Sequence, residues 1–235
     1  MKIANAVVLV SGANRGIGQA FVRELLARGA RKVYAGSRDP ANISPQAGVH
    51  PLRLDVNKPE DVAAAVAQAP DVTLVINNAG IAQTGGFLAE DSEAVARRMF
   101  ETNFFAVLRM SKAFAPVLAA NGGGGLLNVL SIASWVNGSD LAAYSASKSA
   151  AWSLTNSLRY ELAAQKTQVL GLHMAFVDTD LTRGLDAPKS SPADIVRRTL
   201  DALEAGLDEV LADDLTQHVK RGLAADRPSY LPQRA

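Results

Sequence analysis

Short apolar runs alternate with longer amphipathic stretches along the chain. Runs rich in valine, isoleucine and leucine predict buried strands at residues 7–10, 32–36, 49–54, 72–76, 126–130, 169–174 and 209–211. Helical spacing of apolar residues predicts helices at about 16–28, 92–120, 142–164 and 213–223, and Pro59 and Pro192 mark the starts of two others. This alternation predicts an α/β fold, namely a Rossmann-type doubly wound parallel sheet of about seven strands with helices on both faces.

The composition is that of an ordinary globular domain. The 235 residues show no repeat and no linker, so residues 1–235 are predicted to form a single domain. With 24 basic and 23 acidic residues spread along the chain, the formal net charge is +1, and we expect no nucleic-acid partner. The absence of cysteine excludes disulfides, thiolate nucleophiles and cysteine-based metal sites. His50, His173 and His218 lack the spacing of metal ligands, so no metal is expected.

The apolar runs are too short for insertion into a membrane. None approaches the ~20 residues that a membrane-spanning helix needs. The run at residues 6–10 is also too short for the core of a signal peptide, and polar residues follow it at once. The sequence therefore predicts a soluble, cytoplasmic protein with no membrane partner.

A glycine-rich turn, Ser11-Gly12-Ala13-Asn14-Arg15-Gly16-Ile17-Gly18, joins the first predicted strand to the first helix. Glycines there let the chain turn sharply and let backbone approach a pyrophosphate, while the helix N-terminus offers oriented N–H donors. A tight loop without a ligand is the plain alternative. The strand before the turn and the helix after it favour a dinucleotide site, formed by Gly12, Asn14, Arg15, Gly16, Ile17 and Gly18.

The end of the second strand indicates which dinucleotide binds. Sites that prefer NAD place an acidic side chain there, which holds the ribose hydroxyls and repels a 2′-phosphate. This chain has Ser37 followed by Arg38, and a hydroxyl with a guanidinium suits a phosphate dianion. Arg15 would approach that phosphate from the other side. A one-residue shift would instead make Asp39 a ribose ligand, but we favour NADP(H) over NAD(H).

Tyr144 and Lys148 lie one helical turn apart, so the phenol and the ammonium share a face. Ser131 comes earlier, at the end of the fifth strand, where active-site side chains of open α/β sheets gather. Hydride addition to a carbonyl leaves charge on oxygen that must receive a proton, and a nearby ammonium lowers the pKa of a phenol. We therefore predict that Tyr144 exchanges the proton, that Lys148 tunes it and holds the nicotinamide ribose, and that Ser131 binds the substrate oxygen. Ser134 has an unsuitable spacing and is interpreted as a loop residue.

These motifs resemble those of the short-chain dehydrogenase/reductase family, in its smaller, non-extended, NADP(H)-preferring branch. The resemblance covers about residues 7–182 and includes Asn77-Asn78-Ala79-Gly80 after the fourth strand. It implies that Asn103 completes the catalytic group with Ser131, Tyr144 and Lys148, by holding a water that carries protons. It also implies cofactor contacts from Asp55, Val56, Asn77, Ala79, Gly80, Tyr144, Lys148, Val177 and Thr179.

Some of these positions have plain structural interpretations as well. Asp55 is a common residue type for a turn, Asn77 could help to pin the sheet, and Thr179 could cap the short helix that follows. The family's usual Pro-Gly before this threonine is Met174-Ala175 here, which leaves the loop conformation open. Residues 183–235 are predicted to supply a substrate loop, the last strand and an oligomer contact.

Three further residues near the motifs carry weaker signals. His173 is predicted to be a buried histidine with satisfied hydrogen bonds. Trp135 either borders the substrate pocket or packs in the core, and Trp152 faces the core or a partner helix.

The motifs together predict an enzyme that transfers a hydride between NADP(H) and a carbonyl or alcohol carbon of a small ketone or aldehyde. The resemblance implies a homodimer or homotetramer. A non-catalytic dinucleotide sensor on the same fold is the main alternative, which the presence of Tyr144 and Lys148 disfavours. An epimerase or dehydratase of the extended branch would need a longer chain.

Overall fold

The computed structural model describes residues 1–232, and within them seven strands form one sheet in the order β3-β2-β1-β4-β5-β6-β7. All neighbouring strands pair in parallel; Val8, for example, lies opposite Val33 of β2 and Leu74 of β4. The predicted doubly wound parallel sheet is therefore confirmed. The strands are β1 (Val7–Ser11), β2 (Lys32–Ser37), β3 (Val49–Arg53), β4 (Leu74–Asn77), β5 (Gly125–Val129), β6 (Gln168–His173) and β7 (Glu209–Leu211).

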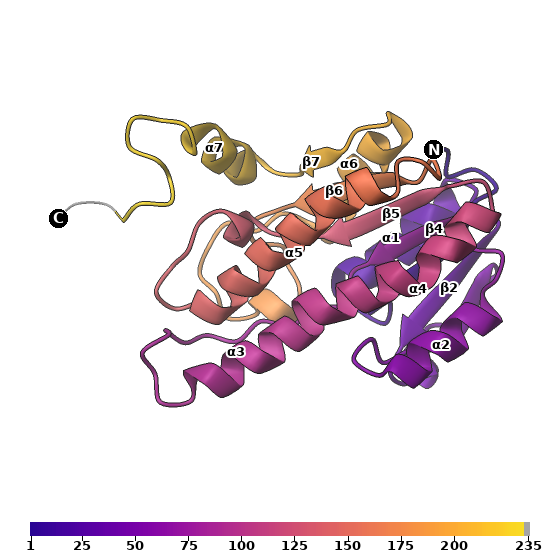
Figure 1. The fold of residues 1–235 in the computed structure, drawn as a ribbon, viewed down its shortest axis with the longest axis horizontal. Helices are drawn as coiled ribbons and strands as arrows, with labels where there is room; N and C mark the ends of the chain where they lie inside the picture. The colour runs from indigo at the N-terminus through magenta and orange to yellow at the C-terminus, as the bar shows by residue number, and fades with distance from the viewer. Residues whose placement is uncertain (233–235) are drawn as a thin grey trace.

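Helices cover both faces of the sheet (Figure 1). One face packs against α1 (Gly16–Ala27) and α6 (Pro192–Glu204), and the other against α2 (Pro59–Gln68), α4 (Ala106–Ala120) and α5 (Ala142–Glu161). Two shorter helices complete the described chain, α3 (Ser92–Phe100) before α4 and α7 (Asp214–Gly222) after β7.

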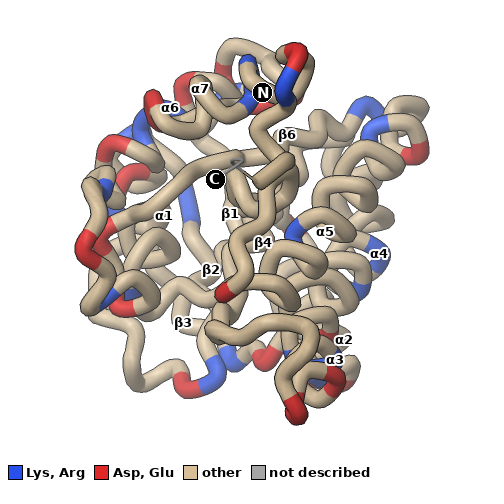
Figure 2. Tube along the Cα trace, turned by 90° about the vertical axis from the view of Figure 1, so that its left-hand side faces the viewer, with Lys and Arg blue, Asp and Glu red and all other residues tan. Residues whose placement is uncertain are grey.

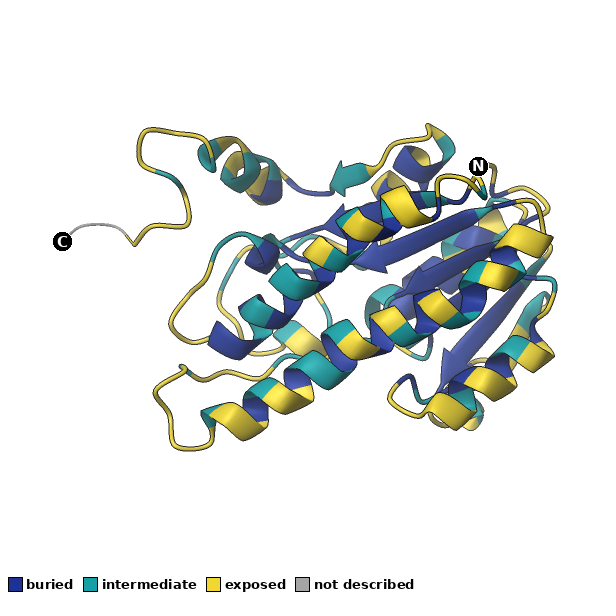
Figure 3. Ribbon diagram, in the orientation of Figure 1, coloured by how far each residue is buried: buried dark blue, intermediate teal, exposed yellow. Residues whose placement is uncertain are grey.

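Strand β1 shows why these apolar runs form central strands. Successive side chains point to opposite faces, so Val7 and Leu9 join the core under α2, α4 and α5, while Val8 and Val10 join the core under α1 and α6. All four are fully buried, which stabilises the fold by about 2 kcal/mol for each side chain. In Figure 3 most of the strands are dark blue, which marks them as buried, and the helices beside them carry both buried and exposed residues.

The long helix predicted at residues 92–120 is interrupted. A π-helical turn, Glu101–Phe105 (η2), separates α3 from α4 and contains Asn103. The apolar periodicity carries no trace of this turn, because one widened turn shifts the pattern only slightly. Other predicted boundaries differ from the structure by one to three residues, as for β6 and α5.

The strand order reverses between β1 and β4, so the connections from these two strands leave toward opposite sides of the sheet. Ligands of open α/β sheets bind beyond the carboxyl ends of the strands at such a switch point. Basic and acidic residues are interspersed along the outer helices and loops (Figure 2). In residues 1–232, no helix is both long and apolar enough to cross a membrane.

Candidate active site

The glycine turn at the end of β1 is shaped by close backbone approaches. Gly12 and Gly16 have φ values of +64° and +55°, which side-chain-bearing residues rarely adopt. Gly18 is a buried residue in the first turn of α1. A Cβ atom on it would lie 2.1 Å from the carbonyl oxygen of Gly12. The turn therefore folds tightly over the N-terminus of α1, with Asn14 and Ile17 half-buried beside it.

Two residues that the sequence analysis did not select hold this turn in place. The Asn78 side-chain amide donates to the carbonyl oxygens of Ser11 and Gly12, at 2.9 and 3.1 Å. The Ser11 hydroxyl accepts from the backbone N–H groups of Asn78 and Ala79, at 3.0 and 3.1 Å. The signal available in the sequence was the occurrence of polar residues at the ends of two strands, β1 and β4, that adjoin in the sheet.

The Asn77 side chain points to the opposite side of β4 from the glycine turn, and its predicted place beside the ribose stays a prediction. That side chain is buried and its amide donates to Asn128 Oδ1 at 2.8 Å and to the Ser111 hydroxyl at 3.4 Å. Asn77 therefore pins β4 to β5 and α4, which is the structural interpretation considered for it. Successive residues of a strand face opposite ways, which gives Asn78 the contact with the turn.

Ser37 is the last residue of β2 and is buried, and Arg38 follows it on the surface. Asp39 is turned away from a ligand role, because its carboxylate accepts from Ala41 N at 3.1 Å and from Asn42 Nδ2 at 3.2 Å, and so caps a short 3₁₀ turn, Pro40–Asn42 (η1). This occupation of Asp39 argues against the one-residue shift that would have made it a ribose ligand.

Asp55 follows β3 in a turn. Its Oδ1 accepts from Asn57 N at 3.1 Å, as expected for the turn interpretation, and the side chain remains half-exposed. Val56 is buried, and its carbonyl oxygen accepts from the Arg109 guanidinium at 2.7 Å. The contact fixes the end of β3 to α4.

Ser131, Tyr144 and Lys148 converge beside the carboxyl ends of β4 and β5. Ser131 follows β5 and lies near enough to the Tyr144 phenol to lower its pKa, and Lys148 Nζ lies 5.9 Å from the centre of the phenol ring. Lys148 Nζ donates to the carbonyl oxygen of Val129 at 2.8 Å, and a Cβ atom on Gly80 would lie 3.7 Å from it. The serine, the phenol and the ammonium thus share one small region with the backbone of Gly80.

Burial governs the protonation of this group. It raises the pKa of the Tyr144 phenol, an effect that the hydrogen bond with Ser131 offsets in part. Burial lowers the pKa of Lys148 to about 8. The predicted lowering of the pKa of Tyr144 by the adjacent ammonium is not found in this structure, where burial is the largest cause and raises that pKa, and where the ammonium bonds to Val129.

Asn103 lies at the same site, in the π-helical turn. Its Oδ1 accepts from Ile81 N at 3.0 Å, and its Nδ2 donates to the carbonyl oxygen of Ile81 and to the Ser147 hydroxyl, both at 2.9 Å. The side chain therefore ties the segment after Gly80 to α5. Both N–H groups of the amide are occupied by protein partners, so a water held by Asn103 would have to donate to an oxygen of this residue.

The loop after β6 faces the glycine turn. Val177 is buried and its carbonyl oxygen accepts from the Thr182 hydroxyl, while Thr179 N lies 3.3 Å from the same hydroxyl. The Thr179 side chain would be 3.3 Å from a Cβ atom on Gly16, so the predicted capping position also lies against the turn. Met174 keeps strand-like contacts, since its carbonyl oxygen accepts from Ile132 N at 3.0 Å.

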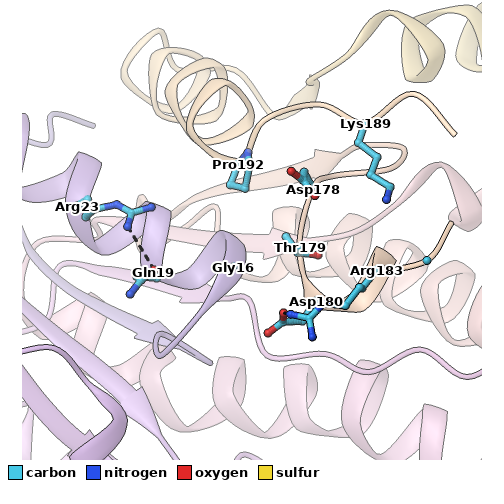
Figure 4. A pocket seen from close by; sticks show the side chains of 10 residues that line it. Gly16, Gln19, Arg23, Asp178, Thr179, Asp180, Arg183, Lys189 and Pro192 are labelled. Carbon is cyan, nitrogen blue, oxygen red and sulfur yellow. Dashed lines mark hydrogen bonds and ion pairs between the residues drawn. The ribbon is translucent and has the colours of Figure 1, made fainter. Parts of the chain in front are cut away.

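A hollow of about 430 Å³ separates α1 from this loop (Figure 4). Gln19 and Arg23 line it from α1, and Thr179, Asp180 and Arg183 from the loop. Arg15, at the N-cap of α1, pairs with Asp180 at 3.1 Å across the two segments, and both side chains are exposed. Arg15 is thus directed toward the loop after β6 in this structure, rather than toward Ser37.

Comparison with known proteins agrees with this arrangement. A family model described as short chain dehydrogenase matches residues 6–190. The chain is 37% identical over 209 residues to D-erythrulose reductase from Gallus gallus, covering 86% of this chain and 84% of that protein. It is 34% identical over 209 residues to cis-4-hydroxycyclohexanecarboxylate dehydrogenase from Sinomonas cyclohexanicum, covering 85% and 81%. The crystal structure of a short chain dehydrogenase from Burkholderia cenocepacia J2315 in complex with NADP is similar, with a TM-score of 0.92, 42% identity, and 97% and 96% of the two chains covered.

Proposed function

The chain belongs to the short-chain dehydrogenase family, and from that membership we propose that it reduces a small ketone or aldehyde with NADPH and oxidises the corresponding alcohol in reverse. The convergence of Ser131, Tyr144 and Lys148 next to Gly80 carries this proposal. The named relatives include a reductase and a dehydrogenase, which are the two directions of one such reaction. A dinucleotide sensor would have no need of a buried phenol and ammonium held together.

The residues around the glycine turn fit NADP(H). The turn packs tightly against the N-terminus of α1, since an added Cβ at Gly18 would clash with the Gly12 carbonyl, and backbone N–H groups at a helix N-terminus suit a pyrophosphate. Ser37 and Arg38 follow at the end of β2, where a hydroxyl and a guanidinium suit a 2′-phosphate. Support for NADP comes also from the cofactor named in the Burkholderia cenocepacia structure. Arg15 would contact the 2′-phosphate together with Arg38 once its ion pair with Asp180 is broken.

The protein's own groups supply proton transfer and orientation. Bound NADPH supplies the hydride. Tyr144 donates its phenol proton to the carbonyl oxygen as charge develops there, and Ser131 stabilises that oxygen by a hydrogen bond. Lys148 would hold the ribose hydroxyls of the nicotinamide nucleotide and return a proton to Tyr144. Asn103 holds the segment at Ile81 against α5 through its hydrogen bonds to Ile81 and Ser147. Thr179 and Val177 are proposed to close the nicotinamide end from the loop after β6.

We further propose a cytoplasmic homodimer or homotetramer. Phe105 and Leu108 at the start of α4 are 45% and 37% exposed, and Tyr160 on α5 is 86% exposed. Such side chains on adjacent helices of one face suit contact with a second copy. The chain itself is proposed to be one domain, with residues 183–232 supplying the substrate loop, the last strand and part of the subunit contact; the final three residues of the segment predicted for this role, 233–235, lie outside the described residues.

A turnover assay tests the function directly. Purified protein is incubated with NADPH or NADH and with ketones, aldehydes and alcohols of graded size, and the absorbance of the reduced nicotinamide is followed. We expect consumption of NADPH with at least one small ketone or aldehyde. Binding of NADPH without turnover of any of these compounds would favour the sensor instead.

Arg38→Ala tests the cofactor preference. Removal of one charge-assisted contact costs about 1.5–3 kcal/mol, so the Kd for NADPH should rise by about 10- to 100-fold, while the Kd for NADH changes by less than about twofold. The loss should shrink at high salt because Arg38 is exposed. Fluorescence titration of both cofactors measures the effect, with Arg97→Ala on α3 as the control. Equal losses for NADPH and NADH would contradict the assignment.

The pKa of Lys148 predicts the pH dependence of reduction. Only the ammonium form can return a proton to Tyr144, and burial brings the pKa of Lys148 down to about 8. The value of kcat/KM for NADPH should therefore be constant below pH ~8 and fall about tenfold per pH unit above it, since kcat/KM reports groups of the free enzyme. A profile that stays flat to about two pH units above that value would contradict this role.

A further inference from the structure

Four side chains behind Ser131 form a closed group, the Trp135 cluster, made of Trp135, His173, Glu209 and Lys220. The indole of Trp135 stacks on the His173 ring at 3.9 Å between centroids, and Lys220 Nζ lies over the same indole at 4.3 Å. Lys220 Nζ also lies 3.0 Å from Glu209 Oε2, and Glu209 Oε1 lies 3.3 Å from His173 Nε2. The cluster joins the loop after β5, the strands β6 and β7, and helix α7.

The cluster touches the backbone of Ser131. His173 is fully buried, and its Nδ1 lies 3.1 Å from the carbonyl oxygen of Ser131. The same serine carries the hydroxyl that lies near the Tyr144 phenol and lowers its pKa. A change at His173 therefore acts on the position of the Ser131 hydroxyl without touching the substrate.

The two nitrogens of His173 face two acceptors. In this structure Nε2 is buried and makes no hydrogen bond, although Glu209 Oε1 lies 3.3 Å from it. A neutral imidazole has a single N–H, so its proton is either on Nδ1, where it bonds to the Ser131 carbonyl, or on Nε2, where it faces Glu209, and only an imidazolium carries both. Burial lowers the pKa of His173, which favours the neutral ring. The position of one proton then decides whether the Ser131 carbonyl is held or repelled.

Lys220 influences that proton through Glu209. The pKa of Glu209 is lowered to about 2 by its contacts with His173 and Lys220, so Glu209 is an anion at neutral pH. An anion without a cation beside it would draw the proton of His173 to Nε2. With Lys220 at 3.0 Å, the charge of Glu209 is neutralised, and the proton can reside on Nδ1, facing Ser131.

We propose that Lys220 is a positioning residue for Ser131, which acts by keeping the proton of His173 on Nδ1. This inference rests on the proposed function, because it assigns the role through a catalytic serine. It places α7, which lies outside the residues matched by the family model, in the apparatus that orients the site.

The charged groups around His173 are few among the described residues. Glu209 approaches from β7 and Lys220 from α7. From α5, Arg159 lies on the same face but donates to the carbonyl oxygens of Val169 and Asp208. Asp213, at the N-cap of α7, accepts from Ala175 N and Thr216 N. Glu209 is therefore the group that competes with the Ser131 carbonyl for the proton.

The test compares Lys220→Met, Lys220→Arg and the double variant Lys220→Met with Glu209→Gln, using Arg221→Met on the exposed side of α7 as the control. Lys220→Met keeps an aliphatic chain against Trp135 but leaves Glu209 uncompensated. We expect its kcat to fall on the order of tenfold relative to wild type, because small misplacements of catalytic groups cost up to about 100-fold. KM for NADPH should stay unchanged, and Lys220→Arg should retain turnover.

Two readouts separate this role from loss of packing. The kcat of Lys220→Met, as a ratio to wild type at each pH, should recover as pH falls and His173 becomes an imidazolium that donates to both acceptors. In the double variant, the neutral amide that replaces the Glu209 carboxylate can donate to Nε2 of His173, so the ratio should return toward one at all pH values. A double variant as slow as Lys220→Met would overturn the proposal.

The tautomer of His173 supplies a readout that does not depend on turnover. With three histidines in the chain, the ring ¹⁵N shifts can be assigned one by one. At the pH where the kcat of Lys220→Met is lowest, we expect the Nδ1–H form in the wild type and in Arg221→Met, and the Nε2–H form in Lys220→Met. Wild-type protein with the Nε2–H form would refute the inference even if the enzyme is active, whereas an inactive protein with the expected tautomers would count against the proposed function alone.

Discussion

Tyr144→Phe is expected to lower kcat/KM for carbonyl reduction by about 10²- to 10⁴-fold, the usual contribution of a positioned acid. The substitution removes one oxygen, the phenol oxygen near Ser131, and leaves the ring beside Lys148 in place. Because burial raises the pKa of the phenol, Tyr144 is protonated at neutral pH and suited to give its proton to an oxygen that develops negative charge. Without that proton, hydride transfer would have to generate an unprotonated alkoxide.

The measurement combines steady-state kinetics with NADPH titration. The Kd for NADPH should change by less than about threefold, since the phenol oxygen is one hydrogen bond among several that hold the nicotinamide end. Tyr160→Phe, at an 86% exposed position on α5, is a matched control that should have wild-type kinetics. Turnover by Tyr144→Phe at the wild-type rate would refute the role of the phenol.

Much of this site could be predicted from the sequence because it depends on local pattern. The apolar runs that become β1, β4 and β5 are buried on both faces and therefore contain few polar residues. For this reason they could be predicted as strands, in their order along the chain. The spacing of Tyr144 and Lys148 is a helical turn, so their shared orientation followed once α5 was expected. The position of Ser131 followed from the strand end before it.

The features that could not be predicted depend on long-range contacts. Asn77 and Asn78 differ by one position, and only the register of β4 against β1 decides which of them reaches the glycine turn. The pKa of Tyr144 depends on how deeply α5 packs, which no spacing encodes. Trp135 and His173 are far apart in the sequence, and their stacking with Lys220 exists only after β6, β7 and α7 assemble. The prediction of a buried His173 was correct, but the prediction that its hydrogen bonds are satisfied was not, because Nε2 has no hydrogen-bond partner; the contact of Nδ1 with Ser131 was not foreseen.

Gly18→Ala is expected to damage both the fold and the cofactor site. The new methyl group would lie 2.1 Å from the carbonyl oxygen of Gly12 and 2.6 Å from Asn78 Nδ2, so the turn and the amide that holds it must both move. Overpacking of this kind costs about 3 kcal/mol, which corresponds to a Tm lower by roughly 10 °C for a chain of this size. If the displaced turn loses two backbone contacts to the pyrophosphate, NADPH binding weakens by about 100-fold.

Gly138→Ala provides the matched comparison, because a Cβ atom on Gly138 would meet no heavy atom within 4 Å and its φ lies outside the left-handed region. That variant should keep the wild-type Tm and Kd. Differential scanning calorimetry and NADPH titration of both variants distinguish the clash at Gly18 from a general effect of replacing glycine. A Gly18→Ala protein with unchanged NADPH affinity would mean that the pyrophosphate does not rest on this turn, and the cofactor site would then have to be sought elsewhere along the carboxyl ends of the strands.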